Sequence, residues 1–445
     1  MRLFNDVFLR GCPMFLARMS LFAAAATVIG LSGASVVIAD DWPQWGGPQR
    51  DLAWREKGIV KELATKELLP RVWATPIGAG YAGPAVANGK VFVMDRSADG
   101  ERVLCLDADS GKEIWKHEYA ARYTVSYPLG PRCTPTIDDG RVFSVGAMGH
   151  LFCLDEKSGQ VLWQKNFVED FGTKLPVWGM VHAPLVEGNQ VIILVGGENA
   201  LVVSFDKVTG KELWRALDDR EVGYAPPMIF SFGGKRQLIV WHPSAVTSLD
   251  PATGKQIWQV PYQVRSGLTV MTPRQVGNRL FVASFYNGPR MIEVADDGQS
   301  ARVVWSGKSD SEQRTDGVHP IIMTPVFDGS HIYGIDSYGQ LRCLDASDGK
   351  RLWETLDATG QGRWWNCFLV PHEDRFFLHN EQGELLIAKL TPSGYQEISR
   401  AKLLEPTQPI LRRMTVWSHP AFAMQSVFAR NDKEIIRVNL AANLR

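Results

Sequence analysis

Short runs of apolar residues separated by glycine turns recur along most of the chain. Each clear copy has an apolar strand that ends in Asp, a turn with Gly, and a strand that carries Trp. Neighbouring tryptophans of this set lie 42 to 51 residues apart, a period typical of propeller repeats. A weaker copy spans Ile292 to Trp305, and a degraded copy spans Leu386 to Ser399, with Ile398 near the Trp position. The clear copies are LCLDADSGKEIW from Leu104, FCLDEKSGQVLW from Phe152, VSFDKVTGKELW from Val203, TSLDPATGKQIW from Thr247 and RCLDASDGKRLW from Arg342.

A second pattern precedes each copy, so that each unit has four strands, A to D. Examples are GPAVANGKVFVM from Gly83 and TPTIDDGRVFSV from Thr134, where a strand, a tight turn and another strand follow one another. Asn-Gly and Asp-Gly turns supply the positive φ that two-residue hairpins need. Eight A strands are expected, starting near Gly83, Thr134, Ala183, Pro226, Thr272, Thr324, Cys367 and His419.

The two ends of the repeat array complete one another. The eighth unit reaches only its C strand, IIRVNL at 435–440, and an orphan segment, PRVWATPI at 70–77, carries Trp73 at a D-strand position. Closure of a ring removes exposed sheet edges. The sequence therefore predicts an all-β, eight-bladed β-propeller of four-stranded antiparallel blades, closed by the N-terminal strand in the last blade. The tryptophans expected to pack between blades are Trp73, Trp115, Trp163, Trp214, Trp258, Trp305 and Trp353.

The first 39 residues have the order of a secretory signal peptide. A basic start is followed by a charge-free stretch, Leu21 to Ala39, which ends in Val37-Ile38-Ala39 before two aspartates. The alternative is an uncleaved anchor, and translation can also start at Met14 or Met19. We divide the chain into a signal peptide (1–39), an N-terminal strap (40–69) and a propeller (70–445). This predicts a periplasmic or secreted protein with no membrane span after cleavage.

The repeated L-D-x-x-x-G-x-x-x-W pattern resembles that of pyrroloquinoline-quinone dehydrogenases. It is also similar to the repeat of the non-catalytic propeller lipoprotein of the outer-membrane β-barrel assembly machine. The segment Trp42-Pro43-Gln44-Trp45 with the Gly46-Gly47 pair resembles the start of many exported bacterial proteins with these repeats, and we interpret it as part of a strap. The resemblance covers about residues 70 to 440 and implies a propeller, but it leaves catalysis open.

The quinone-dependent enzymes that this chain resembles hold their cofactor with features that the sequence lacks. They carry an adjacent Cys-Cys pair, a calcium ion bound by carboxylate and amide oxygens, a catalytic Asp and a Trp beneath the quinone. Here the six cysteines are never adjacent, and no Asp/Asn/Glu cluster resembles the calcium ligands. We therefore expect no cofactor and no metal; the quinone with calcium remains an alternative without its expected ligands.

The cysteines fit the repeat better than a disulfide framework. Cys105, Cys153 and Cys343 share one strand-C slot in different blades, too far apart for a bridge, which needs Cα atoms within about 7 Å. Cys133 and Cys153 belong to one blade, with strand B expected between them. The sequence predicts five free, buried thiols in the mature chain.

Charge and motifs exclude several function classes. Lys plus Arg and Asp plus Glu both number 48, with no basic run, so nucleic-acid binding is not expected. The chain also has no nucleophile elbow, phosphate loop, zinc-ligand spacing or nucleotide fingerprint.

One face of the propeller collects His, Arg and aromatic residues, because D-to-A and B-to-C connections emerge together around the channel. Such side chains suit a planar or sugar-like ligand or a protein partner, and the arginines favour an anionic or hydrogen-bond-accepting group. The alternative is that they plug the channel. The same connections also carry Tyr81, His150, Tyr286, Tyr338, Trp364, His379 and Arg413. The candidate face consists of Arg132, Trp178, His182, Tyr224, His242, Arg265, His319, Arg363, Trp365, Trp417 and His419.

Three functions fit these patterns. The first is an exported, non-catalytic propeller that binds an envelope protein or another envelope component as a scaffold. The second is a quinone-dependent dehydrogenase with an atypical site. The third is a propeller that binds a glycan or another small ligand. A monomer is expected in each case.

Overall fold

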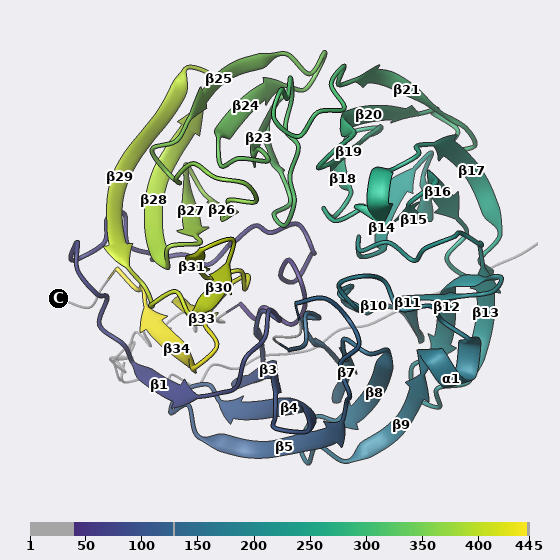
Figure 1. Ribbon diagram of the computed structural model, residues 1–445, viewed down its shortest axis with the longest axis horizontal. Coiled ribbons are helices and arrows are strands. Elements are labelled where there is room, and N and C mark those ends of the chain that lie inside the picture. The colour runs from purple at the N-terminus through teal and green to yellow at the C-terminus, as the bar shows by residue number, and fades with distance from the viewer. Residues whose placement is uncertain (1–39, 128–129, 443–445) are drawn as a thin grey trace, which may run out of the picture. The chain divides into compact units, whose positions relative to one another are not determined.

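The computed structural model describes residues 40–127 and 130–442, and these form eight four-stranded antiparallel sheets arranged as the blades of a propeller. Figure 1 shows the blades around a common centre, with the first strand of each blade innermost. The predicted all-β fold and blade number are confirmed. The predicted signal peptide, residues 1–39, lies outside the described residues.

The first four blades use consecutive strands. From the inner strand A to the outer strand D they are β2 (Ala85–Ala87), β3 (Lys90–Arg96), β4 (Gly100–Asp107) and β5 (Glu113–Ala120); β6 (Thr136–Asp138), β7 (Arg141–Val145), β8 (His150–Asp155) and β9 (Val161–Asn166); β10 (Leu185–Glu187), β11 (Gln190–Gly197), β12 (Ala200–Asp206) and β13 (Glu212–Ala216); and β14 (Met228–Phe232), β15 (Lys235–His242), β16 (Ala245–Leu249) and β17 (Gln256–Pro261).

Blades five to seven follow the same order, and blade eight takes its outer strand from the N-terminus. The strands are β18 (Arg274–Val276), β19 (Arg279–Ser284), β20 (Gly288–Val294) and β21 (Ala301–Ser306); β22 (Val326–Asp328), β23 (His331–Ile335), β24 (Leu341–Asp345) and β25 (Arg351–Thr355); β26 (Cys367–His372), β27 (Arg375–Asn380), β28 (Glu384–Thr391) and β29 (Gly394–Lys402); and β32 (Ala421–Ala423), β33 (Ser426–Arg430), β34 (Glu434–Asn439) and β1 (Trp73–Pro76).

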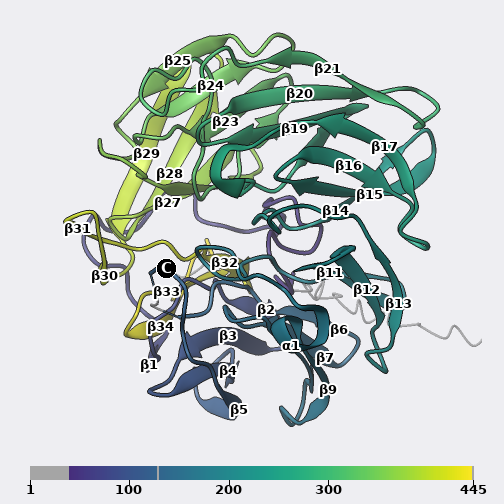
Figure 2. The ribbon, with the colours of Figure 1, turned by 45° about the vertical axis from the view of Figure 1, so that its right-hand side comes forward.

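Three short elements lie in connections between blades. Helix α1 (Phe167–Phe171) follows β9, and a 3-10 turn (Arg265–Gly267) follows β17. The hairpin of β30 (Gln408–Ile410) and β31 (Arg413–Thr415) connects blade seven to blade eight and stands apart from both sheets in Figure 2.

The ring closes as the sequence predicts. Strand β1 pairs antiparallel with β34, with Trp73 opposite Arg437 and Pro76 opposite Glu434. Because the last blade is built from both ends of the propeller, separating the blades requires breaking this sheet as well as the packing between blades.

The predicted inter-blade tryptophans, which we call the outer tryptophans, each bond through the indole N–H. Trp115 Nε1 donates to the carbonyl oxygen of Glu156 in the next blade at 2.9 Å. Trp258 instead donates to Gln237 Oε1 at 2.9 Å, and the Gln237 amide in turn donates to Gly298 O of the next blade at 2.7 Å. The carbonyl contacts of the others are Trp73 to Ala108, Trp163 to Lys207, Trp214 to Pro251, Trp305 to Ala346 and Trp353 to Thr391, over 2.8–3.2 Å.

The glycine of the repeat is the other half of this contact. Gly159 has a φ of 71°, and a Cβ at that position would lie 2.5 Å from the Trp115 ring. A residue with a side chain is therefore excluded both by the turn and by the indole of the preceding blade. The repeat glycine therefore contributes to the contact between blades, because the turn that contains it provides a flat surface on which the tryptophan of the previous blade packs.

Blade seven departs from the pattern, and the Trp position differs from the prediction by one residue. Trp115 lies opposite Cys105, whereas Ile387 lies opposite Ser399; Ile398 is the bulged residue that precedes it. Ser399 therefore occupies the Trp position. Its hydroxyl accepts a hydrogen bond from the backbone N–H of the buried Leu63 at 3.0 Å. The end of the strap thus packs where this blade has no tryptophan.

The start of the strap crosses the ring on the side of the A-to-B turns. Trp42 forms a β-bridge with Val86 of blade one, and Trp54 N–H donates to Pro371 O of blade seven at 2.9 Å. The fully buried Arg50 donates to Pro184 O of blade three at 2.9 Å, and burial lowers its pKa to about 10. In Figure 1 this purple segment lies at the centre of the ring, so the strap closes one end of the channel.

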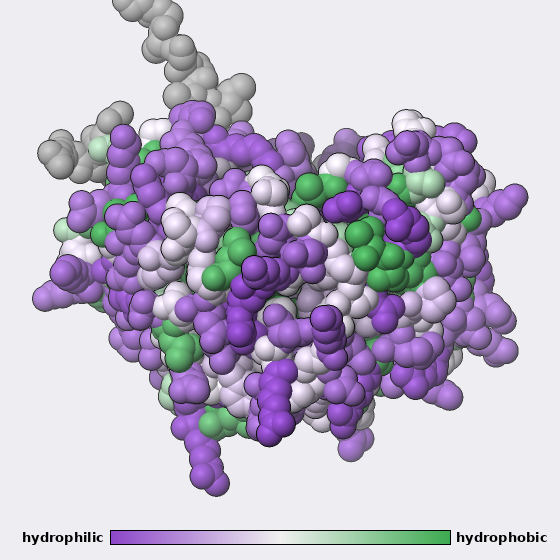
Figure 3. Space-filling model, turned by 90° about the horizontal axis from the view of Figure 1, so that it is seen from above, coloured by the Kyte–Doolittle hydropathy of each residue, from purple (hydrophilic) through white to green (hydrophobic). Residues whose placement is uncertain are grey.

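The five described cysteines are buried free thiols: Cys105, Cys133, Cys153, Cys343 and Cys367. Strand β7 separates Cys133 from Cys153 in their blade, as predicted. Within residues 40–127 and 130–442, no helix is both long and apolar enough to cross a membrane. The side of the molecule in Figure 3 is mainly hydrophilic, with separate hydrophobic groups.

Candidate functional site

A cavity of about 210 Å³ lies at the open end of the channel, and we call it the aromatic well. Its walls come mainly from residues just before or at the start of the A strands, so all eight blades contribute. The floor comes from Trp45 of the strap, whose Nε1 donates to Thr272 Oγ1 at 2.9 Å. The lining residues are Trp45, Tyr81, Tyr127, Arg132, Thr134, Trp178, Val181, Ala183, Tyr224, Pro226, Leu268, Val270, Ile321, Ile322, Trp364, Phe368, Trp417 and His419.

Arg132 is the charged side chain in this lining. Its guanidinium lies over the Tyr81 ring, 5.1 Å from the centroid, and donates to the backbone carbonyl of Ser126 at 3.2 Å. No carboxylate of the described residues forms an ion pair with it, and burial lowers its pKa. A partly desolvated cation at an apolar wall favours a ligand with an anionic or hydrogen-bond-accepting group.

Three lining residues present buried polar atoms that have no hydrogen-bond partner within the described chain: Tyr81 Oη, Trp364 Nε1 and His419 Nε2. The other ring nitrogen of His419, Nδ1, contacts the Pro420 carbonyl at 2.5 Å and is therefore assigned the proton. Burial lowers the pKa of His419 to about 4, so at neutral pH its Nε2 is an acceptor. Buried polar atoms without partners are costly. All three atoms are shielded from solvent, so a ligand in the well satisfies these two donors and one acceptor only if the wall shifts to expose them.

Two aromatic residues of the well have strained backbones. Tyr127 and Trp364 have φ values of 55° and 65°, in the left-handed region that bulky residues rarely adopt. Their rings meet edge to face, with centroids 6.4 Å apart. Such strain persists only where the surroundings enforce it, and it gathers at ligand-binding positions.

Ion pairs around the rim fix two of these rings. The Arg363 guanidinium lies 4.5 Å from the Trp364 ring centroid and is paired with Glu312 at 2.7 Å. Trp417 Nε1 donates to Glu381 Oε2 at 2.8 Å, and Arg413 pairs with the same carboxylate at 2.5 Å. Burial raises the pKa of Glu381. The aromatic rings are therefore held in place before any ligand arrives.

Five residues of the predicted face line the well, and six do not. Arg132, Trp178, Tyr224, Trp417 and His419 meet there from four different connections between blades; Trp178 and Tyr224 pack with centroids 5.4 Å apart. The residues that do not line it are His182, His242, Arg265, His319, Arg363 and Trp365.

Each of those six has a structural reason for its place. His182 is buried in its blade, and Nε2 contacts Leu194 O at 2.9 Å. Trp365 folds back onto Gly360, whose added Cβ would meet the ring at 2.4 Å. Arg265 stacks on the Tyr286 ring at 4.5 Å. Arg363 supports Trp364 from behind, as described above.

His242 belongs to a buried hydrogen-bonded chain, Asp219–His242–Thr247, whose order of carboxylate, imidazole and hydroxyl resembles that of a catalytic triad. Nδ1 contacts Asp219 Oδ2 at 2.6 Å, and Nε2 contacts Thr247 Oγ1 at 2.9 Å. Ser244 also donates to Asp219 at 2.8 Å. The histidine and Thr247 are buried and do not line the aromatic well. We interpret this chain as a brace of blade four.

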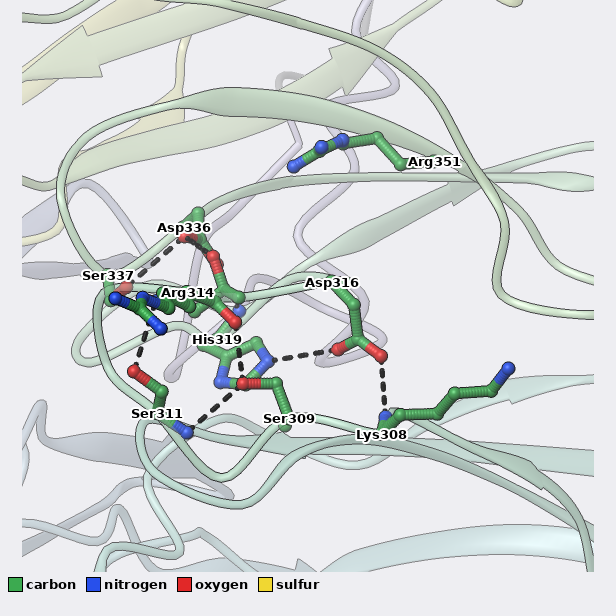
Figure 4. Close-up of polar contacts among 12 residues, drawn as sticks. Lys308, Ser309, Ser311, Arg314, Asp316, His319, Asp336, Ser337 and Arg351 are labelled. Atoms are coloured by element: carbon green, nitrogen blue, oxygen red, sulfur yellow. Dashed lines mark hydrogen bonds and ion pairs between the residues drawn. The ribbon is translucent and has the colours of Figure 1, made fainter.

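His319 lies in the polar network of the loop between blades five and six (Figure 4). Its backbone N–H donates to Asp336 Oδ1 at 2.8 Å, and Nε2 lies 3.6 Å from Asp316 Oδ1. Ser309 is nearby, but its hydroxyl donates to Arg314 O at 2.6 Å and so does not form a nucleophile–base pair with His319. Across the described residues, no group of three or more His, Cys, Asp or Glu could hold a metal.

The well also contains residues that the predicted face omitted. Tyr127 and Trp364 lie in D-to-A connections, so their position along the repeat could have identified them. Trp45 was assigned to the strap, and nothing in the sequence placed it under the channel. The aliphatic part of the lining, such as Val270 and Ile321, was omitted because the prediction gave weight to polar and aromatic types.

The lining does not fit pyrroloquinoline quinone with calcium. Calcium needs several converging oxygen ligands, and this lining contains no Asp, Glu or Asn side chain. The quinone carries three carboxylates, whereas Arg132 is the one cation of the wall.

Fold and site together define an eight-bladed propeller whose channel is closed by a strap and ends in an aromatic well. A family model described as outer membrane protein assembly factor BamB matches residues 51–164 and 99–355, and the chain belongs to this family. Outer membrane protein assembly factor BamB of Shewanella oneidensis is 22% identical over 50% of this chain and 56% of that protein, so the match spans little more than half of that relative.

Two solved structures share the fold. BamB from Moraxella catarrhalis has a TM-score of 0.58 and 17% identity, covering 85% of this chain and 99% of that one. Quinohemoprotein alcohol dehydrogenase from Comamonas testosteroni has a TM-score of 0.60 and 14% identity, covering 91% of this chain and 81% of that one. An assembly factor and a dehydrogenase are therefore alike in architecture, and the fold does not separate their functions.

Proposed function

We propose that this chain is an exported, non-catalytic propeller that binds a protein of the cell envelope, and that the aromatic well is its main binding site. The observation that carries the proposal is the well itself: rigidly held aromatic rings from all around the channel, with one partly desolvated arginine and unsatisfied polar atoms. Membership of the assembly-factor family supports a scaffold, and the lining offers no nucleophile–base pair or metal site.

The chemistry of the well defines what the partner must present. An apolar or aromatic side chain can pack against Trp178, Trp364 and Trp417, which resemble the rigid aromatic anchors of protein interfaces. An adjacent carbonyl or carboxylate can accept from Arg132 or Trp364 Nε1. A segment of extended chain carries both kinds of group, whereas a smooth apolar surface carries only the first.

Site-specific photo-cross-linking in the exporting bacterium tests the proposal. A benzophenone amino acid replaces Tyr127, which is 39% exposed at the well, or Leu213, which is 50% exposed on the outer strand β13. We expect adducts with an envelope protein from position 127 and none from position 213. Adducts from position 213 alone would contradict the proposal. Stoichiometric binding of pyrroloquinoline quinone with substrate-dependent dye reduction would overturn it in favour of an enzyme.

A sugar-like ligand is the second candidate, favoured by the three unsatisfied polar atoms beside the rings. Carbohydrates combine apolar faces with hydroxyl groups that donate and accept hydrogen bonds. Titration of tryptophan fluorescence with a panel of disaccharides tests this candidate. The Trp364→Phe variant keeps a ring but removes the N–H, so saturable binding to the native chain that weakens in this variant supports the candidate. Unchanged fluorescence in the native chain removes it.

A further inference from the structure

Glu56 is a buried carboxylate at the closed end of the channel, on the opposite side from the aromatic well. Its side chain accepts hydrogen bonds from Trp54 Nε1 at 2.8 Å and from the backbone N–H of Gln425 at 3.0 Å. The residue is 3% exposed, and no cation of the described residues pairs with it. Burial raises the pKa of its carboxyl group. A buried carboxylate without a cation is an expensive arrangement.

A third donor to this carboxylate is the backbone nitrogen of Asp40, which lies 3.2 Å from Glu56 Oε1. Asp40 directly follows the predicted cleavage point. The charge-free stretch Leu21 to Ala39 and the small residues at positions 37 and 39 are typical of a leader that is removed there. The atom that cleavage would change is thus already in contact with the carboxylate that lacks a cation.

We propose that an endopeptidase cleaves the chain between Ala39 and Asp40, and that Glu56 then binds the new α-ammonium group of Asp40 as a partly buried ion pair. The hydrolysis consumes one water: the Ala39 carbonyl becomes a carboxylate, and the proton released goes to the new amino group of Asp40, since such groups have a pKa of roughly 8. The nitrogen need not move, because it already lies at 3.2 Å. Cleavage replaces one amide N–H with three donors and a positive charge.

This ion pair would couple processing to closure of the channel. Asp40 lies two residues before Trp42, which pairs with Val86, and five before Trp45, the floor of the well. Glu56 itself bonds Gln425, so its carboxylate joins both ends of the crossing segment to blade eight. The strap is therefore held most tightly only after the leader has been removed.

The experiment uses two forms of the mature chain. One starts at Asp40, produced by export or by a tag protease that leaves no added residue. The other carries Ser-Ala-Ala before Asp40, which keeps every side chain but returns the Asp40 nitrogen to an amide. Each form is combined with Glu56→Gln, which preserves an acceptor oxygen, and with Glu373→Gln as the matched control. Glu373 pairs with Lys57 but is 40% exposed.

Intact mass of the exported protein should give Asp40 as the first residue, and any other start overturns the proposal. In denaturant unfolding, Glu56→Gln should increase the unfolding equilibrium constant about tenfold more in the Asp40-starting form than in the extended form, a coupling of the size seen between contacting groups. Glu373→Gln should have equal effects in both forms. Equal effects of Glu56→Gln in both forms would mean that the carboxylate stabilises the fold only through Trp54 and Gln425, and this result would overturn the proposed ion pair. These readouts do not depend on the function proposed for the well.

Discussion

The outer tryptophans and the tryptophans of the well have the same side chain in two different situations. Every outer tryptophan has its N–H bonded, six of the seven directly to a backbone carbonyl of the next blade, and five of the seven rings cover a repeat glycine. In the well, Trp364 has a left-handed backbone and an N–H without a partner in the described chain. The first set completes the fold. Trp364 is held in a strained conformation with an unpaired N–H, and strain of this kind is found at ligand-binding positions.

The largest expected effect is the loss of an outer tryptophan. Trp115→Ala removes a buried ring and its bond to Glu156, so we expect the free energy of unfolding to fall by about 3–5 kcal/mol. Denaturant unfolding measures it. The folded fraction should still form the position-127 cross-link, because blade interfaces and well are separate. A loss below about 1 kcal/mol would contradict the structural role assigned to this set.

Blade seven sharpens the comparison because it lacks an outer tryptophan. Leu63 of the strap is 7% exposed there, and Leu63→Ala should lower the free energy of unfolding by about 2–3 kcal/mol. Leu68→Ala is the matched control, since Leu68 is 50% exposed and should change stability by less than about 0.5 kcal/mol. Equal effects of the two substitutions would show that the strap does not substitute for the missing tryptophan.

Blade three should also respond to pH. Burial lowers the pKa of His182 to about 4, whereas the unfolded residue titrates near 6.5. The unfolded state therefore binds more protons between these values, and stability is complete above pH 6.5 and decreases as the pH falls toward 4. His182→Gln, which can still donate to Leu194, should remove about 2 kcal/mol of the stability that the native chain loses between pH 7 and pH 5. Parallel pH profiles for the two proteins would contradict the burial argument.

The smallest expected effect on stability is at Trp364. Trp364→Gly removes contacts of a partly exposed ring but also relieves a φ of 65°, so the two changes offset one another to within about 1 kcal/mol. Thermal unfolding measures the balance. A loss as large as that of Trp115→Ala would place Trp364 with the outer set.

The repeat specified the fold because its signals are local and recur. The Asp, Gly and Trp of each copy predict the turn, the blade contact and the spacing, and the orphan strand with Trp73 predicts ring closure. Where the signal decays, as around Ile398 and Ser399, the alignment slipped by one residue, because the hairpin there is longer: Ile387 pairs with Ser399, 12 residues on, whereas Cys105 pairs with Trp115, 10 residues on.

The well was predicted less completely, for a physical reason. Position in the repeat places a residue on the correct face, but the direction of its side chain depends on loop conformation. His182 and Trp178 are close in sequence, yet one is buried in its blade and the other lines the well. Trp45 reaches the floor through a strap that has no repeat, and Tyr127 reaches the wall through a left-handed backbone that the sequence does not announce.

The central claim is that the aromatic well is the binding site. It is tested most directly by measuring how tightly the envelope partner found by cross-linking binds to matched variants of this chain. Isothermal titration calorimetry compares the native chain with two variants. Trp364→Gly removes a ring of the well, and Trp115→Phe changes an outer tryptophan but keeps an aromatic ring between the blades. The account predicts that the first variant weakens binding by about 1–3 kcal/mol, roughly 5- to 150-fold, while the second leaves the dissociation constant unchanged. Equal dissociation constants for the native chain and Trp364→Gly, with both proteins folded, would contradict the assignment of the well as the binding site.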